Sequence, residues 1–494
     1  MGGDGHEFKS QSMKEINRKI GAGVLWNLAG LFMTRGANTL FMLLLARLLA
    51  PEAFGLIAMA SLVFELASAF INSGLGSALI QSKKVTDTDL NTVFYTNLLL
   101  SGVAYTGLFV GAPFIASFYS QPELSSLIQV MGLIIFINAA CIVQVAVLSR
   151  KMDFKSQMKA KTISVVVSGS LAIIAAWYNW GVWSLVVQML SAALVTALIL
   201  WLVSPWRPGL DISGESFNRL FRFGRNLLAE GMLQVLFENS YVLVIGRLFS
   251  AEATGLYFLA KKINSLVSQQ LTAAVQQATF PALSTLQDDN NTLKHKLRQI
   301  MQLMMFLITP IMALLAGLAP SLFALLFNER WVLAVPYLQL LCVVGALYPL
   351  HALNMNLLNV KGRSDLVLKV GLIKKVVNLT LLFLAIPYGV FGIVSSQVIG
   401  SFLALIPNTY FSAKLVGYSL FEQIQDVVKP FFAAICAGVG AWLLMNQIEG
   451  GGIELISSGF FGVIIYLTVS FFIRAEGANL ILVKLMRKYS CIVE

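Results

Sequence analysis

The chain has 494 residues, of which 57% are hydrophobic and only 12% are charged, and its net charge is +11. A soluble globular protein carries about 25% charged residues, whereas apolar runs of roughly 20 residues, long enough to cross a bilayer as a helix, recur here from end to end. The composition excludes a soluble enzyme and predicts an all-α polytopic membrane protein.

The apolar runs predict about fourteen transmembrane helices in chain order. We expect spans at 22–46, 54–80, 93–118, 126–148, 162–179, 182–203, 226–248, 254–279, 299–327, 332–359, 366–387, 390–411, 430–447 and 453–473. The predicted domains are a cytoplasmic amphipathic N-terminus (1–21), an N-terminal six-helix bundle (22–205), a basic cytoplasmic linker (206–225), a C-terminal six-helix bundle (226–413), a linker with transmembrane helices 13 and 14 (414–474) and a cytoplasmic tail (475–494).

Two stretches 200 residues apart share one sequence pattern and indicate an internal repeat. Residues 47–56 and 247–256 carry Arg-Leu, Glu-Ala and Gly-Leu at equivalent positions, and each closes one apolar run and opens the next. Ala112-Pro113 with Ala319-Pro320, and 181–186 with 389–394, keep the same order. Internal repeats are typical of transporters, so we expect two six-helix bundles around a central cavity, with two C-terminal helices outside the repeat.

Positive charge alternates between the two sides of the predicted membrane protein. Lys and Arg gather in every second loop, whereas the opposite loops hold only Arg47, Arg247 and Arg330. This distribution places both termini in the cytoplasm and explains the net charge without a nucleic-acid partner. The external loops are all short: 119–125, 178–181, 328–331 and 446–452. They leave no room for a catalytic domain, so we do not expect an enzyme.

Charged and amide side chains inside apolar runs are costly there and are candidates for a site. The candidates for binding an anionic substrate are Arg35, Asn38, Lys261, Lys262, Lys374 and Asn378, and the candidates for ion coupling are Glu65, Glu230 and Glu238. Two alternatives stay open: the lysines reach the membrane surface from span ends, or Arg35 forms an ion pair with a glutamate of the seventh span. The three histidines and four cysteines show no ligand spacing, so we expect no metal and no cofactor.

Several short motifs are typical of one family. They are Ala46–Leu49 with Phe54-Gly55, Arg222–Gly224, Gly255–Tyr257 with Ala260, Phe280–Leu283 with Asp288-Asp289, Phe327–Trp331 and Leu338–Cys342. Over nearly its whole length the chain resembles the Wzx-type polysaccharide flippases of the MOP exporter superfamily, in particular the colanic acid exporter and lipopolysaccharide biosynthesis protein branch.

The resemblance implies a transport function. It implies that undecaprenyl-pyrophosphate-linked oligosaccharide crosses the bacterial inner membrane by alternating access, coupled to an ion gradient, for exopolysaccharide or O-antigen synthesis, with polysaccharide polymerase and chain-length machinery as partners. The first alternative is a cation-coupled multidrug-type antiporter. That branch tends to carry an acid in the first span, where this chain has Arg35. A membrane glycosyltransferase, ligase or polymerase is a further alternative, but it should show a long outer loop.

Overall fold

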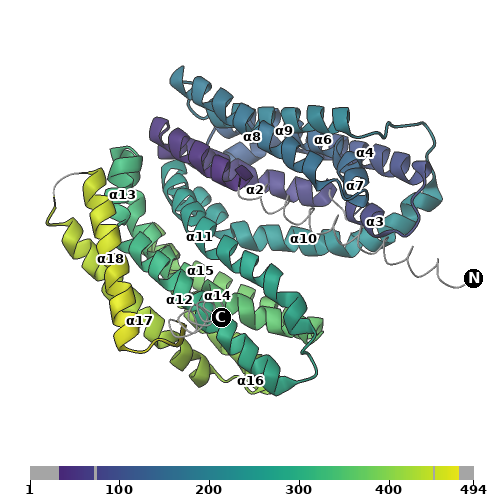
Figure 1. Cartoon of the computed structure of the whole chain (residues 1–494). Coiled ribbons are helices and arrows are strands. Elements are labelled where there is room, and N and C mark those ends of the chain that lie inside the picture. The colour runs from purple at the N-terminus through teal and green to yellow at the C-terminus, as the bar shows by residue number, and fades with distance from the viewer. Residues whose placement is uncertain (1–32, 72–74, 449–450, 478–494) are drawn as a thin grey trace, which may run out of the picture. The chain divides into compact units, whose positions relative to one another are not determined.

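The computed structural model describes residues 33–71, 75–448 and 451–477 (Figure 1). The side chains of residues 70 and 220–230 are outside this description. Every regular element within these ranges is a helix, which confirms the prediction of an all-α protein. The amphipathic N-terminus predicted for 1–21 and most of the predicted tail lie outside the described residues. The chain forms two compact units, Met1–Gly255 and Leu256–Glu494, here called unit 1 and unit 2.

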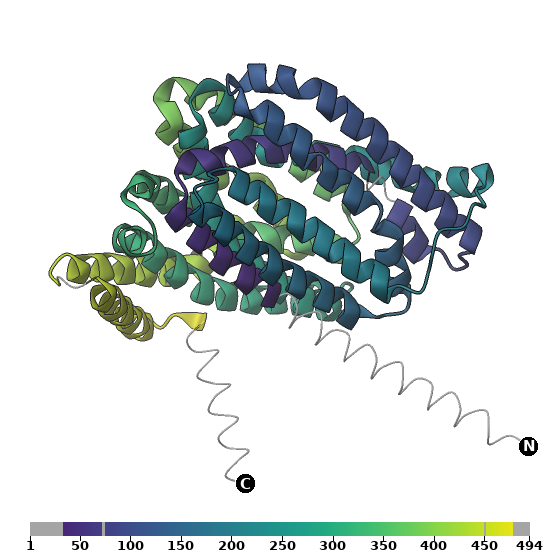
Figure 2. The same cartoon turned by 90° about the horizontal axis from the view of Figure 1, so that it is seen from above.

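Unit 1 is built from long apolar helices joined by short turns. In chain order it contains a helix over residues 33–48, α2 (Pro51–Ile71), α3 (Leu75–Gln81), α4 (Asp87–Tyr119), α5 (Glu123–Met131), α6 (Leu133–Ala139), α7 (Ile142–Arg150), α8 (Phe154–Trp177), α9 (Trp183–Val203), α10 (Gly214–Leu248) and the first turn of α11 (Ala251–Ser284). The closely packed pair α8 and α9 lies side by side in both views (Figures 1 and 2). A short turn between consecutive helices produces this arrangement.

The stretch between α9 and α10 is fastened to the first turns of α4. The Asn91 side chain accepts a hydrogen bond from the backbone N–H of Gly209 at 2.9 Å, and the Thr92 hydroxyl accepts one from the N–H of Ser213 at 3.0 Å. Ser213 also caps α10, because its side-chain oxygen accepts from one of the N–H groups that a helix start leaves unpaired. Helix α10 therefore begins at Gly214, inside the stretch predicted as a linker.

The two repeat stretches meet inside unit 1 through their glycines. A Cβ added to Gly55 would lie 1.7 Å from the carbonyl oxygen of Ala251, and one added to Gly255 would lie 1.8 Å from that of Pro51. Pro51 and Ala251 are equivalent positions of the two stretches, as are Gly55 and Gly255, so the contact is reciprocal. Only residues without a Cβ permit such an approach of two backbones.

Unit 2 consists of the rest of α11 and the helices that follow. They are α12 (Asn290–Gly317), α13 (Ala319–Leu326), η1 (Glu329–Ala334), α14 (Val335–Val360), α15 (Ser364–Ala385), η2 (Ile386–Tyr388), α16 (Gly389–Val416), α17 (Leu420–Met445) and α18 (Gly452–Phe472). Helix α17 packs on both α12 and α18, and the pair α17 and α18 is yellow-green to yellow in Figure 1. Small residues allow this packing, since a Cβ added to Gly438 of α17 would lie 2.7 Å from the carbonyl oxygen of Ala313 of α12.

Ten helical segments within the described ranges are long and apolar enough to cross a membrane. One of them, Ser364–Val416, contains both α15 and α16, which the sequence analysis counts as two spans. The predicted span 22–46 begins outside the described residues, and α10 and α11, at 226–248 and 254–279, are helical but more polar. The multi-pass character is thus confirmed, whereas the total of fourteen spans stays a prediction.

Candidate functional site

The candidate residues fall on five helices. Arg35 and Asn38 lie on the helix over 33–48, Glu65 on α2, Glu230 and Glu238 on α10, Lys261 and Lys262 on α11, and Lys374 and Asn378 on α15. The first five belong to unit 1 and the last four to unit 2.

Two of the carboxylates in unit 1 are hydrogen-bonded to amide side chains where α2 packs on α10. The Glu65 carboxylate accepts a hydrogen bond from the Asn239 amide at 2.7 Å, and the Glu238 carboxylate accepts one from the Gln234 amide, one turn earlier on α10. Both glutamates are exposed on the surface of unit 1. The predicted polar stripe on α10 is therefore present at Gln234 and Glu238, while the side chain of Glu230 lies outside the description.

Arg35 is exposed and forms no ion pair with any side chain that the structure describes. Its backbone carbonyl accepts a hydrogen bond from the Thr39 hydroxyl at 2.8 Å, and a Cβ added to the neighbouring Gly36 would meet nothing within 4 Å. Among the described side chains, the alternative of an ion pair between Arg35 and a glutamate of α10 is not found. The Arg35 guanidinium thus has no ion-pair partner among the side chains that the structure describes.

Unit 2 contains a polar cavity of about 330 Å³ between α11, α14 and α15. Its polar lining is formed by Gln276, Tyr348, His351, Asn356, Asn359 and Lys374. We call this cavity the Lys374 pocket. Of these residues, only Lys374 was predicted from the sequence as a substrate contact.

The remaining candidates of unit 2 do not line the Lys374 pocket. The Asn378 side chain packs on α16, where a Cβ added to Gly400 would lie 2.3 Å from its amide oxygen. Lys262 is exposed and Lys261 is half-buried on α11. The structure therefore brings Lys374 alone of the four into this cavity.

The wall of the Lys374 pocket is held by hydrogen bonds from α14 to α16. The His351 ring is hydrogen-bonded through Nε2 to the Ser401 hydroxyl at 3.0 Å and through Nδ1 to the Asn408 amide at 2.8 Å. One turn further along α14, the amides of Asn354 and Gln423 of α17 exchange two hydrogen bonds, at 2.8 and 3.2 Å. Buried amides that satisfy one another in this way hold helices in one register, so α14 is fixed against both α16 and α17.

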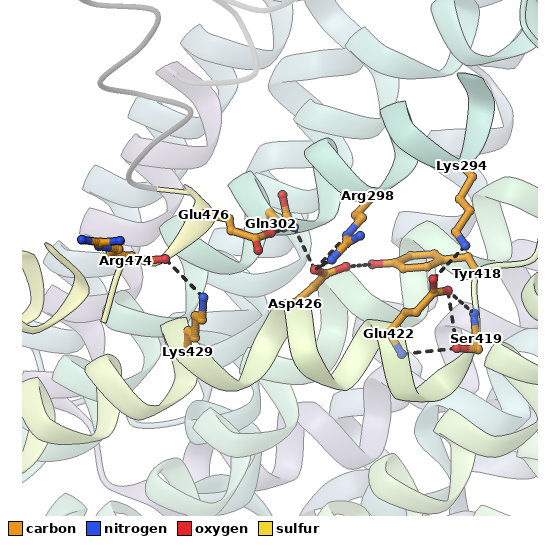
Figure 3. Close-up of polar contacts among 10 residues, drawn as sticks. All are labelled: Lys294, Arg298, Gln302, Tyr418, Ser419, Glu422, Asp426, Lys429, Arg474 and Glu476. Carbon is orange, nitrogen blue, oxygen red and sulfur yellow. Dashed lines mark hydrogen bonds and ion pairs between the residues drawn. The ribbon is translucent and has the colours of Figure 1, made fainter. Parts of the chain in front are cut away.

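A second polar cluster lies where α17 begins (Figure 3). The Asp426 carboxylate is 1% exposed and accepts two hydrogen bonds from the Arg298 guanidinium, at 2.9 and 2.6 Å, and one each from Gln302 and the Tyr418 hydroxyl at 2.8 Å. Burial and the adjacent carboxylate raise the pKa of Tyr418, so this phenol remains a donor at physiological pH. The cluster fastens α17 to α12.

The first turn of α17 carries its own cap beside this cluster (Figure 3). Ser419 and Glu422 form a capping box, and Lys294 of α12 reaches both the Glu422 carboxylate at 2.8 Å and the Gly417 carbonyl at 2.6 Å. Lys294 and Arg298 are among the lysines and arginines whose alternation between loops predicted the cytoplasmic side. The serine and glutamate three residues apart were a sequence signal for the cap.

Comparison with known proteins identifies the family. Residues 44–336 match the polysaccharide biosynthesis protein family. The chain belongs to this family. It is 25% identical over 450 residues to the lipopolysaccharide biosynthesis protein WzxC of Escherichia coli, a match that covers 88% of this chain and 89% of WzxC. It is 28% identical over 330 residues to the succinoglycan biosynthesis transport protein ExoT of Rhizobium meliloti, over 67% of this chain and 66% of ExoT.

A further relative is the teichuronic acid biosynthesis protein TuaB of Bacillus subtilis, 24% identical over 75% of this chain and 78% of TuaB. Among solved structures, the lipid II flippase MurJ in an inward closed conformation matches with a TM-score of 0.70 at 13% identity, over 91% of this chain and 99% of MurJ. An inward-facing multidrug resistance MATE family transporter of the MOP superfamily matches with a TM-score of 0.59 at 16% identity, over 78% and 94%. These two likenesses show the fold, and the sequence matches confirm the Wzx-type resemblance.

Proposed function

We propose that this protein is a flippase that moves lipid-linked oligosaccharide repeat units across the bacterial inner membrane for exopolysaccharide or O-antigen synthesis. The match to polysaccharide biosynthesis proteins over most of the chain carries this proposal. A flippase needs polar groups along an apolar path, and Arg35 and the Lys374 pocket are proposed as such groups. Undecaprenyl pyrophosphate is the proposed carrier.

The architecture proposed for transport is a pair of six-helix bundles related by the internal repeat, with two C-terminal helices outside them. The reciprocal approach of Gly55 and Gly255 supports the repeat, because a local twofold axis brings equivalent residues together in this way. Alternating access then requires that such a contact forms in one state and opens in another.

Arg35 has the proposed role of binding the pyrophosphate. A guanidinium stays charged and can donate two parallel hydrogen bonds to phosphate oxygens. Its exposure and the absence of an ion pair among the described side chains leave those donors available. Asn38, Lys261, Lys262 and Asn378 are proposed to assist as weaker polar contacts.

Glu65, Glu230 and Glu238 are proposed to carry the coupling ion. Carboxylates inside membrane segments commonly lie on ion or proton pathways. Glu65 and Glu238 are each held by a hydrogen bond from an amide side chain, Asn239 and Gln234 respectively. The same carboxylates would serve the alternative function, a cation-coupled multidrug-type antiporter.

The experiment that tests this proposal is complementation of export. The gene is deleted in its native host, and polysaccharide on the cell surface is measured with the wild-type chain, Arg35→Ala or Arg35→Lys supplied on a plasmid. We expect the wild-type chain to restore export, Arg35→Ala to abolish it and Arg35→Lys to retain part of it, at equal protein levels in the membrane. Export at the wild-type rate by Arg35→Ala would remove Arg35 from the substrate path. Normal export in the deletion strain would contradict the function itself.

A further inference from the structure

The Lys374 pocket combines one cation with several neutral hydrogen-bonding groups. Its polar lining contains three amides, a phenol, an imidazole and the Lys374 ammonium, and no carboxylate. We propose that this pocket binds one acidic sugar residue of the oligosaccharide, with Lys374 contacting the sugar carboxylate and the amides contacting its hydroxyls. The assignment rests on the proposed function, because it makes the transported oligosaccharide the ligand.

The charge of the pocket selects an anion. Lys374 lies within an apolar helix and has no ion-pair or hydrogen-bond partner among the described residues. A lysine at the centre of a membrane helix costs about 2.5–3.5 kcal/mol on insertion scales, so a lysine retained there without a protein partner requires a compensating ligand. A carboxylate that enters the pocket would provide the missing counter-charge.

The amide side chains of the pocket can form hydrogen bonds with sugar hydroxyl groups. Asn356 is one of the residues that line the pocket and is only 7% exposed, and its buried amide nitrogen has no hydrogen-bond partner among the described residues. The Gln276 amide donates one hydrogen bond to the Ala352 carbonyl at 2.8 Å, and its own carbonyl oxygen accepts none within the part of the chain that the structure describes. A sugar hydroxyl both donates and accepts, so hydroxyl groups can pair with an unpaired amide donor as well as with an unpaired amide acceptor.

The pocket is also preformed and small. His351 acts as a positioning residue, because both of its ring nitrogens are already engaged by α16 and its ring cannot turn away. A volume of about 330 Å³ lies at the lower end of the range for small-molecule sites, which is roughly 300–1,000 Å³. These features suit one sugar residue and not an extended chain.

A pyrophosphate is the other anion that the proposed substrate would contain. Phosphate oxygens are usually bound by forked guanidinium groups or by N–H groups at helix starts. The Lys374 pocket offers a single ammonium with neutral amides and no guanidinium. The lining therefore favours a singly charged carboxylate on a polyhydroxylated ring.

Direct binding to the purified full-length chain in nanodiscs tests the assignment. Sodium glucuronate, glucose and inorganic pyrophosphate are each titrated by calorimetry against the wild-type chain. We expect glucuronate to bind at least tenfold more tightly than glucose, and pyrophosphate to show no binding that depends on Lys374. Lys374→Gln should weaken glucuronate binding about tenfold or more, and Asn356→Leu, which replaces the amide by an apolar group of similar shape, should weaken it as well.

Lys375→Gln is the matched control, because this lysine is the next residue on α15 and does not line the pocket. Lys374→Gln removes an unpaired charge from an apolar helix and should not unfold the chain, as a single symmetric elution peak would confirm. Unchanged glucuronate binding in both Lys374→Gln and Asn356→Leu would overturn the assignment. If only pyrophosphate binds, and its binding depends on Lys374, the pocket binds the pyrophosphate of the carrier and the assignment of an acidic sugar is wrong.

The complementation assay separates this assignment from the proposed function. If glucuronate binding depends on Lys374 but the deletion strain still has normal surface polysaccharide, the flippase function is contradicted and the assignment of the pocket is supported. If the wild-type chain restores export but does not bind glucuronate, the assignment of the pocket is contradicted and the flippase function is supported.

Discussion

Substitution of Gly55 by alanine tests the reciprocal glycine contact of unit 1. The added methyl group would lie 1.7 Å from the carbonyl oxygen of Ala251, whereas Cβ atoms essentially never come closer than 3.0 Å to such an atom. Helix α2 and the start of α11 must therefore separate by at least about 1.3 Å in that direction. Overpacking of this kind costs about 1–3 kcal/mol, and Gly255→Ala should cost a similar amount because its methyl group meets the Pro51 carbonyl at 1.8 Å.

The two substitutions should not be additive. Once the backbones have separated to admit the first methyl group, part of the space for the second already exists, so the double variant should lose less stability than the sum of the single variants. Thermal unfolding of the purified protein in detergent, with separate measurements for the single variants and the double variant, gives the comparison. Gly111→Ala on α4 is the control, because a Cβ there would meet nothing within 4 Å.

We expect Gly111→Ala to leave the unfolding midpoint unchanged or to raise it slightly, since alanine favours a helix over glycine by up to about 1 kcal/mol. Unfolding midpoints of Gly55→Ala and Gly255→Ala equal to that of Gly111→Ala would refute the close approach. Fully additive losses would refute the reciprocal contact and with it the structural support for the repeat.

Three other predictions follow from the clusters and loops. Arg298→Ala leaves the Asp426 carboxylate, which is 1% exposed, without its cation. It should lower the free energy of unfolding by about 3 kcal/mol, the lower end for a buried ion pair, because the Arg298 side chain is itself 36% exposed. An unchanged unfolding midpoint would contradict this prediction. Asn179→Cys should react with an impermeant thiol reagent added outside the cell and Leu210→Cys should not, although both positions are exposed in the structure, and external labelling at Leu210 would reverse the predicted topology. Glu238→Gln should abolish the dependence of transport on a pH gradient, and gradient-driven transport at the wild-type rate would exclude Glu238 as the coupling group.

Charge and hydropathy predicted the helices and one member of the pocket. Lys374 was found because a charge inside an apolar run is improbable without a use. Ser213 as the cap of α10 was not recognised within the basic stretch, although serine before a helix is a common start signal. Helix α10 therefore begins at Gly214, within the range 206–225 that was predicted as the linker.

The asparagines of α14 show why the rest of the pocket could not be predicted. Asn354 and Asn356 are two residues apart and point to different sides of the helix. Asn354 is paired with Gln423 of α17, whereas Asn356 faces the Lys374 pocket without a partner. The tertiary packing of α14 decides which of the two amides binds another helix and which is left without a protein partner. The ion pair between Asp426 and Arg298 likewise depends on tertiary packing, because the two residues are 128 positions apart in the chain.

Translocation by the purified protein tests the central claim most directly. The full-length chain is reconstituted into liposomes that carry undecaprenyl-pyrophosphate-linked oligosaccharide in both leaflets, and an impermeant glycosidase added outside measures how much oligosaccharide becomes accessible with time. We predict that the inner-leaflet half becomes accessible only in liposomes that contain the protein, and that Arg35→Ala at equal reconstitution removes this fraction. The flippase account is contradicted if, with the wild-type protein and an ion gradient imposed in either direction, the glycosidase reaches only the oligosaccharide of the outer leaflet.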